Sequence, residues 1–160
     1  ISVVTGAGSG TIEATHFNAL VLGDTSSTLD ASALRSKIKV TTGAGDDTVV
    51  TGTGTDTIKL SSGNDSIKSG SGNDNLIVGN DFKGHSEVNG EKGTDKLDLS
   101  FVHIKDVVKV SGETSDKGLL VTLKDNSTLH VLNIEKFVYS TADDGTEVKV
   151  VGIDTLDHLF

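Results

Sequence analysis

A nine-residue repeat between residues 42 and 77 constrains the fold of this chain more than any other feature. Four contiguous units read TGAGDDTVV, TGTGTDTIK, LSSGNDSIK and SGSGNDNLI. In every unit the fourth residue is Gly, the sixth is Asp and the eighth is aliphatic. A repeat this short predicts a solenoid, because one unit cannot bury an apolar face alone and must stack on its neighbours.

The repeat continues less regularly on both sides. Residues 78–89 form a longer unit with an insertion of three residues, in which Ser86 replaces the Asp. Residues 90–98 restore the pattern with Gly93, Asp95 and Leu97. A degenerate unit lies at residues 5–13, where Gly10 stands in the Asp position. Between this unit and residue 42, apolar residues recur at strand spacing, which predicts metal-free solenoid coils or an N-terminal cap.

After residue 98 the pattern changes to ordinary β-strands. Alternation predicts strands at 107–110, 119–123, 129–132, 137–139 and 148–151, with a hairpin turn at 124–127, a turn at 143–145 and a weak helix near 153–160. We therefore expect an all-β chain, a parallel β-roll or β-solenoid with a β-rich C-terminal capping flank. The expected divisions are residues 1–41 (coils or cap), 42–98 (repeats) and 99–160 (flank).

Composition excludes several classes of protein. The formal charge is −9, with 14 basic and 23 acidic residues, and no basic cluster is present, which argues against nucleic-acid binding. No apolar run approaches the roughly 20 residues of a membrane-spanning helix. The chain has no Cys, so disulfides and thiolate metal sites are excluded. It also has no Met, which predicts a fragment or a processed chain of a larger polypeptide.

The repeat carries the chemistry of a hard-cation site. Glycines let the loop backbone turn and aim carbonyl oxygens inward, and the Asp two residues later adds a carboxylate. Two units make one turn of a solenoid, so loops two units apart stack. This stacking pairs the aspartates in three complete calcium sites (Asp47 with Asp65, Asp56 with Asp74, and Asp74 with Asp95) and leaves a fourth that depends on Asp81 beside Asp65. The candidate site residues are Gly43, Gly45, Asp47, Gly52, Gly54, Asp56, Ser61, Gly63, Asp65, Gly70, Gly72, Asp74, Asp81, Gly90, Gly93 and Asp95.

A metal-free alternative exists, because Gly, Asn and Asp clusters are also ordinary turn formers. Asn or Ser would serve as well as Asp in such a turn. Position six is Asp in all four consecutive units, whereas position five varies. The restriction to Asp favours Ca²⁺, and we expect Asp46, at position five, to point to solvent and bind no ion.

The units resemble the nonapeptide G-G-x-G-x-D-x-U-x of the repeats-in-toxin (RTX) family. Thr, Leu or Ser replaces the first Gly in units one to four, and Ser61 replaces the second Gly of unit three. The stretches GTDKLDLS at 93–100 and NIEKFVY at 133–139 also resemble the segments that come after the last repeats in such proteins. The resemblance implies a Ca²⁺-binding β-roll, export by the type I secretion machinery, and a location outside the cell or on a bacterial surface.

Two functions are compatible with the sequence. The first is a non-catalytic Ca²⁺-binding module that folds on binding Ca²⁺ after export and stabilises its parent protein. The alternative is a domain of an RTX adhesin that binds a carbohydrate, a peptide or ice. An exposed aromatic patch near Phe82 and His85, or a flat array of the alternate threonines between Thr51 and Thr57, would favour the alternative. No HExxH or GxSxG motif is present, and no enzyme activity is expected.

Overall fold

The computed structural model describes residues 2–4, 11–13, 18–112, 118–140 and 148–152. Within these residues the chain is all-β, with one short 3₁₀ turn, η1 (Ile104–Asp106), and no α-helix. The expected all-β solenoid is therefore confirmed. The helix predicted near 153–160, the turn at 143–145 and most of the degenerate unit at 5–13 lie outside the described residues.

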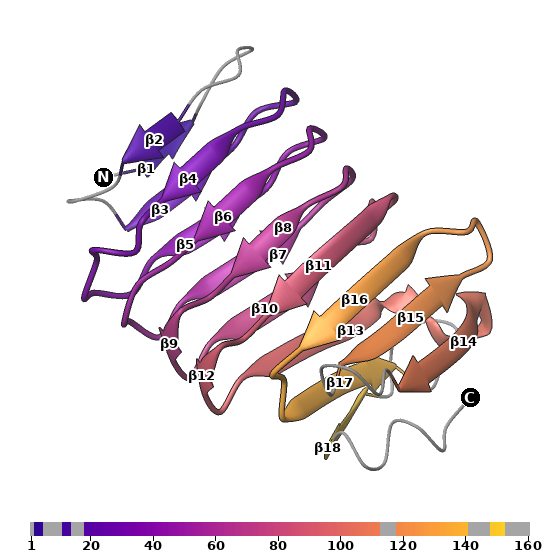
Figure 1. Ribbon diagram of the computed structural model, residues 1–160. Helices are drawn as coiled ribbons and strands as arrows, with labels where there is room; N and C mark the ends of the chain where they lie inside the picture. Colours follow the sequence, from indigo (N-terminus) through magenta and orange to yellow (C-terminus); the bar gives the residue numbers. More distant parts are fainter. Residues whose placement is uncertain (1, 5–10, 14–17, 113–117, 141–147, 153–160) are drawn as a thin grey trace.

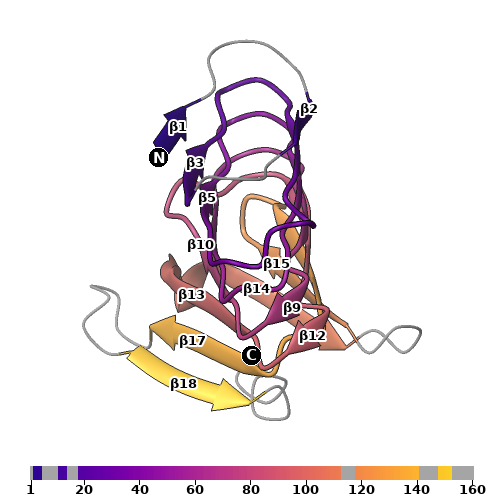
Figure 2. The ribbon, with the colours of Figure 1, turned by 90° about the vertical axis from the view of Figure 1, so that its left-hand side faces the viewer.

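Two long sheets form the walls of the solenoid (Figure 1). The first sheet runs in the order β1 (Ser2–Val4), β3 (Ala19–Val21), β5 (Lys39–Thr41), β7 (Thr57–Leu60), β10 (Asn75–Val78), β13 (Lys96–His103), β17 (Lys136–Ser140) and β18 (Val148–Gly152). The second runs in the order β14 (Val107–Gly112), β15 (Leu119–Leu123), β16 (Thr128–Leu132), β11 (His85–Asn89), β8 (Ser66–Lys68), β6 (Thr48–Val50), β4 (Thr28–Asp30) and β2 (Thr11–Glu13). The end-on view shows the chain winding between the two walls (Figure 2).

The strand register confirms that two repeat units make one turn. Ile58 of β7 pairs with Leu76 of β10, and Val49 of β6 pairs with Ile67 of β8, so partners lie 18 residues apart. The aliphatic residue at position eight of each unit is completely buried. Position eight therefore supplies one inward side chain in every unit, and β7 and β10 each bury a second, Leu60 and Val78. The core is a stack of these side chains between the two walls.

The same sheets extend beyond the repeat block on both sides. β4 and β5 pair in parallel with β6 and β7 of the first repeats, and β3 pairs in parallel with β5. Leu20, Leu29 and Val40 of these strands continue the buried stack. On the other side, β16 pairs in parallel with β11 and β17 pairs in parallel with β13. Parallel pairing thus does not stop at residue 98, because β16 and β17 add one more turn to the solenoid.

The predicted strands of the flank are all present where the structure describes them. β14 and β15 leave the solenoid as an antiparallel excursion, and the turn after β15 returns the chain to β16. β18 closes the first sheet in antiparallel pairing with β17. Antiparallel strands at this end cover part of the edge that a solenoid would otherwise expose.

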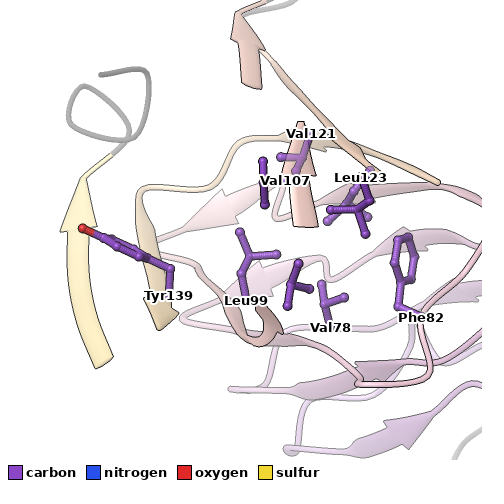
Figure 3. A pocket seen from close by; sticks show the side chains of 9 residues that line it. Val78, Phe82, Leu99, Val107, Val121, Leu123 and Tyr139 are labelled. Carbon is purple, nitrogen blue, oxygen red and sulfur yellow. The ribbon is translucent and has the colours of Figure 1, made fainter. Parts of the chain in front are cut away.

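A small apolar cavity lies where the flank meets the last repeats (Figure 3). Its volume is about 20 Å³, and it is lined by Val78, Phe82, Leu99, Val102, Val107, Val121, Leu123, Leu129 and Tyr139. Such a void is no larger than one water molecule and offers it no polar partner. The insertion of three residues thus places Phe82, only 7% exposed, as a packing residue between the solenoid and its flank.

Core truncation tests the stacked arrangement. Ile58→Ala removes a fully buried side chain between Val40 and Leu76, so we expect a loss of about 2–5 kcal/mol in unfolding free energy at saturating Ca²⁺. Val108→Ala, at a residue that is 62% exposed, should change it by less than about 0.5 kcal/mol. Urea unfolding followed by circular dichroism measures both, and equal losses would contradict the proposed core.

Candidate metal-binding loops

The loops between the walls form two separate columns. The first loop column joins strands of the second sheet to strands of the first and comprises residues 51–56, 69–74 and 90–95. The second loop column joins the walls in the opposite direction and comprises residues 42–47, 61–65 and 79–84. In the first column, β9 (Ser71–Gly72) and β12 (Lys92–Gly93) pair in parallel, so successive loops are hydrogen-bonded to one another.

In the first loop column, the aspartates form a vertical ladder. The backbone N–H of Asp56 donates to Asp74 Oδ1 at 2.7 Å, and the N–H of Asp74 donates to Asp95 Oδ1 at 2.8 Å. At the start of the ladder, the N–H of Ile38 donates to Asp56 Oδ1 at 2.9 Å. Each carboxylate thus holds the loop of the preceding turn, and the predicted pairings of Asp56 with Asp74 and of Asp74 with Asp95 are adjacent in space.

The second oxygen of each of these carboxylates is buried without a hydrogen-bond partner. Oδ2 of Asp56, Asp74 and Asp95 all have this property, and the three residues are at most 2% exposed. Among the described residues, no Lys, Arg or His lies within ion-pair distance of them. Buried charges without a partner are costly, and a bound cation is a standard way of compensating them. This donor chemistry fits Ca²⁺.

The second loop column has the same ladder but satisfies its own oxygens. The N–H of Ser27 donates to Asp47 Oδ1 at 2.8 Å, and the N–H of Asp47 donates to Asp65 Oδ1 at 3.0 Å. Here Oδ2 of Asp47 accepts from the N–H of Gly43, and Oδ2 of Asp65 accepts from the Thr42 hydroxyl. Thr42 occupies a position that is Gly in the RTX pattern. The carboxylate pair of this column is therefore less dependent on a cation.

Below Asp65, the second ladder ends on a hydroxyl. The N–H of Asp65 donates to Ser86 Oγ at 2.9 Å, so Ser86 occupies the next position. Asp81 is exposed, and a Cβ atom built on Gly79 would lie 2.5 Å from its Oδ1. Asp81 thus lies at the start of the insertion, beside Gly79, whereas Ser86 takes the ladder position at the end of the unit.

The loop glycines allow successive turns to approach closely. Gly72 has φ 140°, and a Cβ atom on it would lie 2.0 Å from the carbonyl oxygen of Gly54. Gly63 has φ 129°, and its Cβ would lie 2.2 Å from the carbonyl oxygen of Gly45. No larger residue fits such positions. A Cβ would also collide with backbone of the preceding turn or of the flank at Gly43, Gly45, Gly52, Gly54, Gly70, Gly90 and Gly93. Ser61 is buried, and its N–H donates to the Thr42 hydroxyl.

Residues at position five of the units form a separate, exposed series of hydrogen bonds in the second loop column. In this series the N–H of a later turn donates to a side chain of the earlier turn. Asp46 is exposed, as expected, but its Oδ1 accepts from both the backbone N–H and the side-chain amide of Asn64, at 2.8 and 3.1 Å. The N–H of His85 in turn donates to Asn64 Oδ1. Asp46 therefore links two turns at the surface. The sequence did not reveal this role, because the residue at position five varies among the four units.

Carboxylates alone do not complete a site in either column. Within the residues that the structure describes, no group of three His, Asp or Glu side chains is placed to hold a metal ion. Ca²⁺ takes six to eight oxygen ligands. A Ca²⁺ site in either column would therefore need further oxygens, and the carbonyl oxygens of Gly45 and Gly54 lie close against the glycines of the next loop.

Burial shifts the pKa values of the ladder aspartates upward. Burial raises the pKa of Asp65 and of Asp95 to about 6, against the lowering effect of the backbone N–H groups that donate to them. Burial likewise raises the pKa of Asp47 and Asp74. In each case a neighbouring carboxylate adds to the rise. The charged form of these four carboxyl groups is therefore costlier in the fold than in water, and a bound cation would offset that cost.

Sequence reasoning missed one ladder residue. The N–H of Asp95 donates to Glu135 Oε2 at 2.7 Å, although 40 residues separate the two in the chain. Glu135 lies in the three-residue turn at 133–135 between β16 and β17. The only sign of this role in the sequence is that Glu135, in an Asn-Ile-Glu stretch, comes directly before a strand. The β14–β15 excursion separates Glu135 from Asp95 by 40 residues, so it does not fit the spacing of 18 or 21 residues between the other ladder residues of this column.

The fold and the loops together define a parallel β-solenoid whose stacked loops carry inward carboxylates. The family model of the RTX calcium-binding nonapeptide repeat, with four copies, matches residues 41–76. The chain therefore carries an RTX calcium-binding β-roll module. A comparison with curated proteins found no match.

Repeats of this family are typical of secreted proteins. None of the described residues belongs to a helix that is long and apolar enough to cross a membrane.

The pKa shifts predict that the metal-free fold loses stability as pH rises. Because the folded-state pKa of Asp65 and Asp95 is about 6 against an ordinary 3.8, their stabilising protonation is complete below about pH 4 and lost as pH rises through about 6. We expect calcium-free wild type to show a weaker β-sheet circular dichroism signal at pH 7 than at pH 5. The double variant Asp65→Asn/Asp95→Asn keeps neutral acceptors and should show a smaller drop.

Circular dichroism spectra of both proteins at pH 5, 6 and 7 without Ca²⁺ measure the difference. Because the same background groups titrate in both proteins, comparing them isolates the two aspartates. An equal or larger drop in the double variant would contradict the assigned cause.

Proposed function

We propose that this chain is a non-catalytic Ca²⁺-binding module of a larger exported protein, which folds when Ca²⁺ binds outside the cell and then stabilises its parent. The observation that carries the proposal is the first loop column. Its three stacked aspartates are buried, and each keeps one oxygen without a hydrogen-bond partner. A divalent cation between successive loops supplies the missing positive charge.

The proposed ligands are the position-six carboxylates together with glycine carbonyls of the stacked loops. In the first column they form the sites Asp56 with Asp74 and Asp74 with Asp95, in which Asp74 is shared. The pair of Asp47 with Asp65 is the third site, which must compete with the donors from Gly43 and Thr42. The ladder position beside Asp65 is a serine, so we assign no fourth site to Asp81.

Calcium-coupled folding gives export a physical basis. A chain with a formal charge of −9 and facing carboxylates resists compaction when no cation is present. Such a chain stays extended at low Ca²⁺ and can pass through a type I secretion channel. It then folds in the extracellular space, where modules bind Ca²⁺ with dissociation constants of roughly 10⁻⁴–10⁻³ M. In this proposal the partners are calcium ions, the parent polypeptide and, in transit, the secretion machinery.

Removal of Ca²⁺ should unfold the repeats. Three sites, each filled at about ten times its dissociation constant, contribute roughly 4 kcal/mol together, which is comparable with the stability of a small domain. We expect the β-sheet circular dichroism signal to collapse in EGTA and to return in millimolar Ca²⁺. Identical spectra and melting temperatures in the two conditions would refute the proposal.

The aspartates should differ in their effect on Ca²⁺ binding. Asp74→Asn weakens two sites and should cost the most affinity, whereas Asp47→Asn weakens one and should cost about half as much. Asp46→Asn serves as the control, because Asn still accepts a hydrogen bond from Asn64, and its Ca²⁺ affinity should stay within about 0.5 kcal/mol of wild type. Calorimetric titration ranks the three, and an Asp46 effect as large as that of Asp74 would overturn the loop register.

A second candidate function rests on one surface feature. Phe101 is 56% exposed and lines a cleft of about 310 Å³, together with Asn80 and Lys83 of the insertion and the ion pair Lys124–Asp106 at 3.5 Å. An exposed aromatic face beside such polar groups suits a carbohydrate ligand of an adhesin domain.

The two surface features that the sequence suggested for an adhesin do not form exposed arrays. Phe82 itself is buried, and the ring of His85 contacts the Thr128 hydroxyl. Thr51 is also buried, so the alternate threonines do not form one exposed ice-binding array.

A glycan array tests this second candidate. Calcium-loaded wild type should retain at least one glycan class, and Phe101→Ala should abolish that signal while leaving Ca²⁺ binding unchanged. Val108→Ala removes another exposed apolar side chain that does not line the cleft and is the matched control. Equal glycan signals for wild type and Phe101→Ala would exclude the cleft as the binding surface.

A further inference from the structure

We propose that Glu135, in the C-terminal flank, supplies the last carboxylate of the first loop column and completes a further Ca²⁺ site with Asp95. The inference rests on the proposed function, because it requires that this column bind Ca²⁺. It places a ligand outside the nonapeptide repeats and makes Ca²⁺ a direct link between the repeats and the flank.

Strand register makes Glu135 the structural equivalent of the repeat aspartates. Asp56, Asp74 and Asp95 each come directly before a strand of the first sheet, namely β7, β10 and β13. Glu135 comes directly before β17, whose first residue, Lys136, pairs with Lys96, the first residue of β13. The three-residue turn at 133–135 thus takes the place of a loop in the first column.

The hydrogen bonding obeys the same rule. The N–H of Asp95 donates to Glu135 Oε2 at 2.7 Å, just as the N–H of Asp74 donates to Asp95 Oδ1 at 2.8 Å. The turn at 133–135 is three residues shorter than the six-residue loop at 90–95. The extra methylene of Glu, relative to Asp, allows the carboxylate to reach the same donor.

The second carboxylate oxygen of Asp95 and a backbone carbonyl oxygen of the turn, that of Asn133, both lie beside Gly90. Asp95 is completely buried, and its Oδ2 has no hydrogen-bond partner. A Cβ atom built on Gly90 would lie 2.5 Å from that Oδ2 and 2.2 Å from the carbonyl oxygen of Asn133. Asn133 has φ 50°, a left-handed conformation that Asn tolerates and that turns the backbone sharply at this point.

The first loop column holds more consecutive carboxylates than the second loop column does. Four consecutive carboxylates stand in register in the first column, from Asp56 to Glu135, which gives three gaps between carboxylates. In the second column the register positions on either side of Asp47 and Asp65 are Ser27 and Ser86, which leaves a single gap. Glu135 is exposed, so an ion can reach this last gap from solvent.

Ca²⁺ stoichiometry tests the assignment. Glu135→Gln removes the charge but keeps an oxygen that accepts from the Asp95 N–H, and it should bind one ion fewer than wild type in equilibrium dialysis with radioactive Ca²⁺. Asp56→Asn should also lose one ion, from the opposite end of the column, and the double variant should lose two. Glu91→Gln removes a charge from an exposed residue of the neighbouring loop and should bind as many ions as wild type.

A second readout monitors the flank itself. Tyr139, on β17, is the single Tyr of the chain, which has no Trp, so its fluorescence reports this strand alone. In wild type we expect a Ca²⁺-dependent fluorescence change, and in Glu135→Gln we expect its midpoint to move at least tenfold to higher Ca²⁺. Glu135→Asp keeps the negative charge on a shorter side chain, and we expect it to shift the midpoint less than Glu135→Gln does. This comparison keeps the test valid even if Glu135→Gln folds poorly.

The outcomes separate the two claims. If wild type binds no Ca²⁺, the proposed function itself is wrong. If wild type binds Ca²⁺ and Asp56→Asn loses an ion, while Glu135→Gln binds the same number with the same affinity, only the role of Glu135 is refuted. A loss in Glu91→Gln equal to that in Glu135→Gln would also refute it, since the effect would then be one of net charge.

Discussion

The contact between a backbone N–H of one turn and a carboxylate of the next organises this molecule. It repeats down both loop columns with N···O distances of 2.7–3.0 Å. Charge-assisted hydrogen bonds of this kind hold successive loops at a fixed separation. They also bring acidic side chains close together in a buried place, so the geometry that aligns the turns creates a repulsion that the protein alone does not cancel in the first column.

Under the proposed function, that conflict is what couples folding to the binding of Ca²⁺. The apolar stack between the walls is narrow, because each repeat strand buries only one or two aliphatic side chains. A core this thin leaves little stability in reserve against buried unpaired charge. In the second column, Thr42 and Gly43 relieve the conflict with hydrogen bonds, whereas the first column keeps three bare oxygens. The carboxylates of the first column therefore depend more on a cation than those of the second column do.

The sequence was sufficient to predict the parts of the structure that depend on local periodicity. The nine-residue spacing predicts the walls, the buried position-eight residues and the pairing of Asp56 with Asp74, because each follows from stacking two units per turn. It did not predict the part played by Asp46, because position five varies among the units and no repeated residue marks the contact with Asn64, 18 residues further along the chain. Glu135 escaped for a similar reason, since the excursion of β14 and β15 breaks the period before the solenoid resumes.

The flank does more than cover the end of the solenoid, because the solenoid resumes after the β14–β15 excursion. A cap that merely covered the last turn would need only apolar side chains, and Phe82 and Tyr139 do provide such a contact. β16 and β17 go further, because they repeat the parallel register and place Glu135 under Asp95. Apolar packing is insensitive to Ca²⁺, but a carboxylate in the ladder is not. The flank is thus built so that its docking onto the repeats responds to the same ion as the repeats themselves.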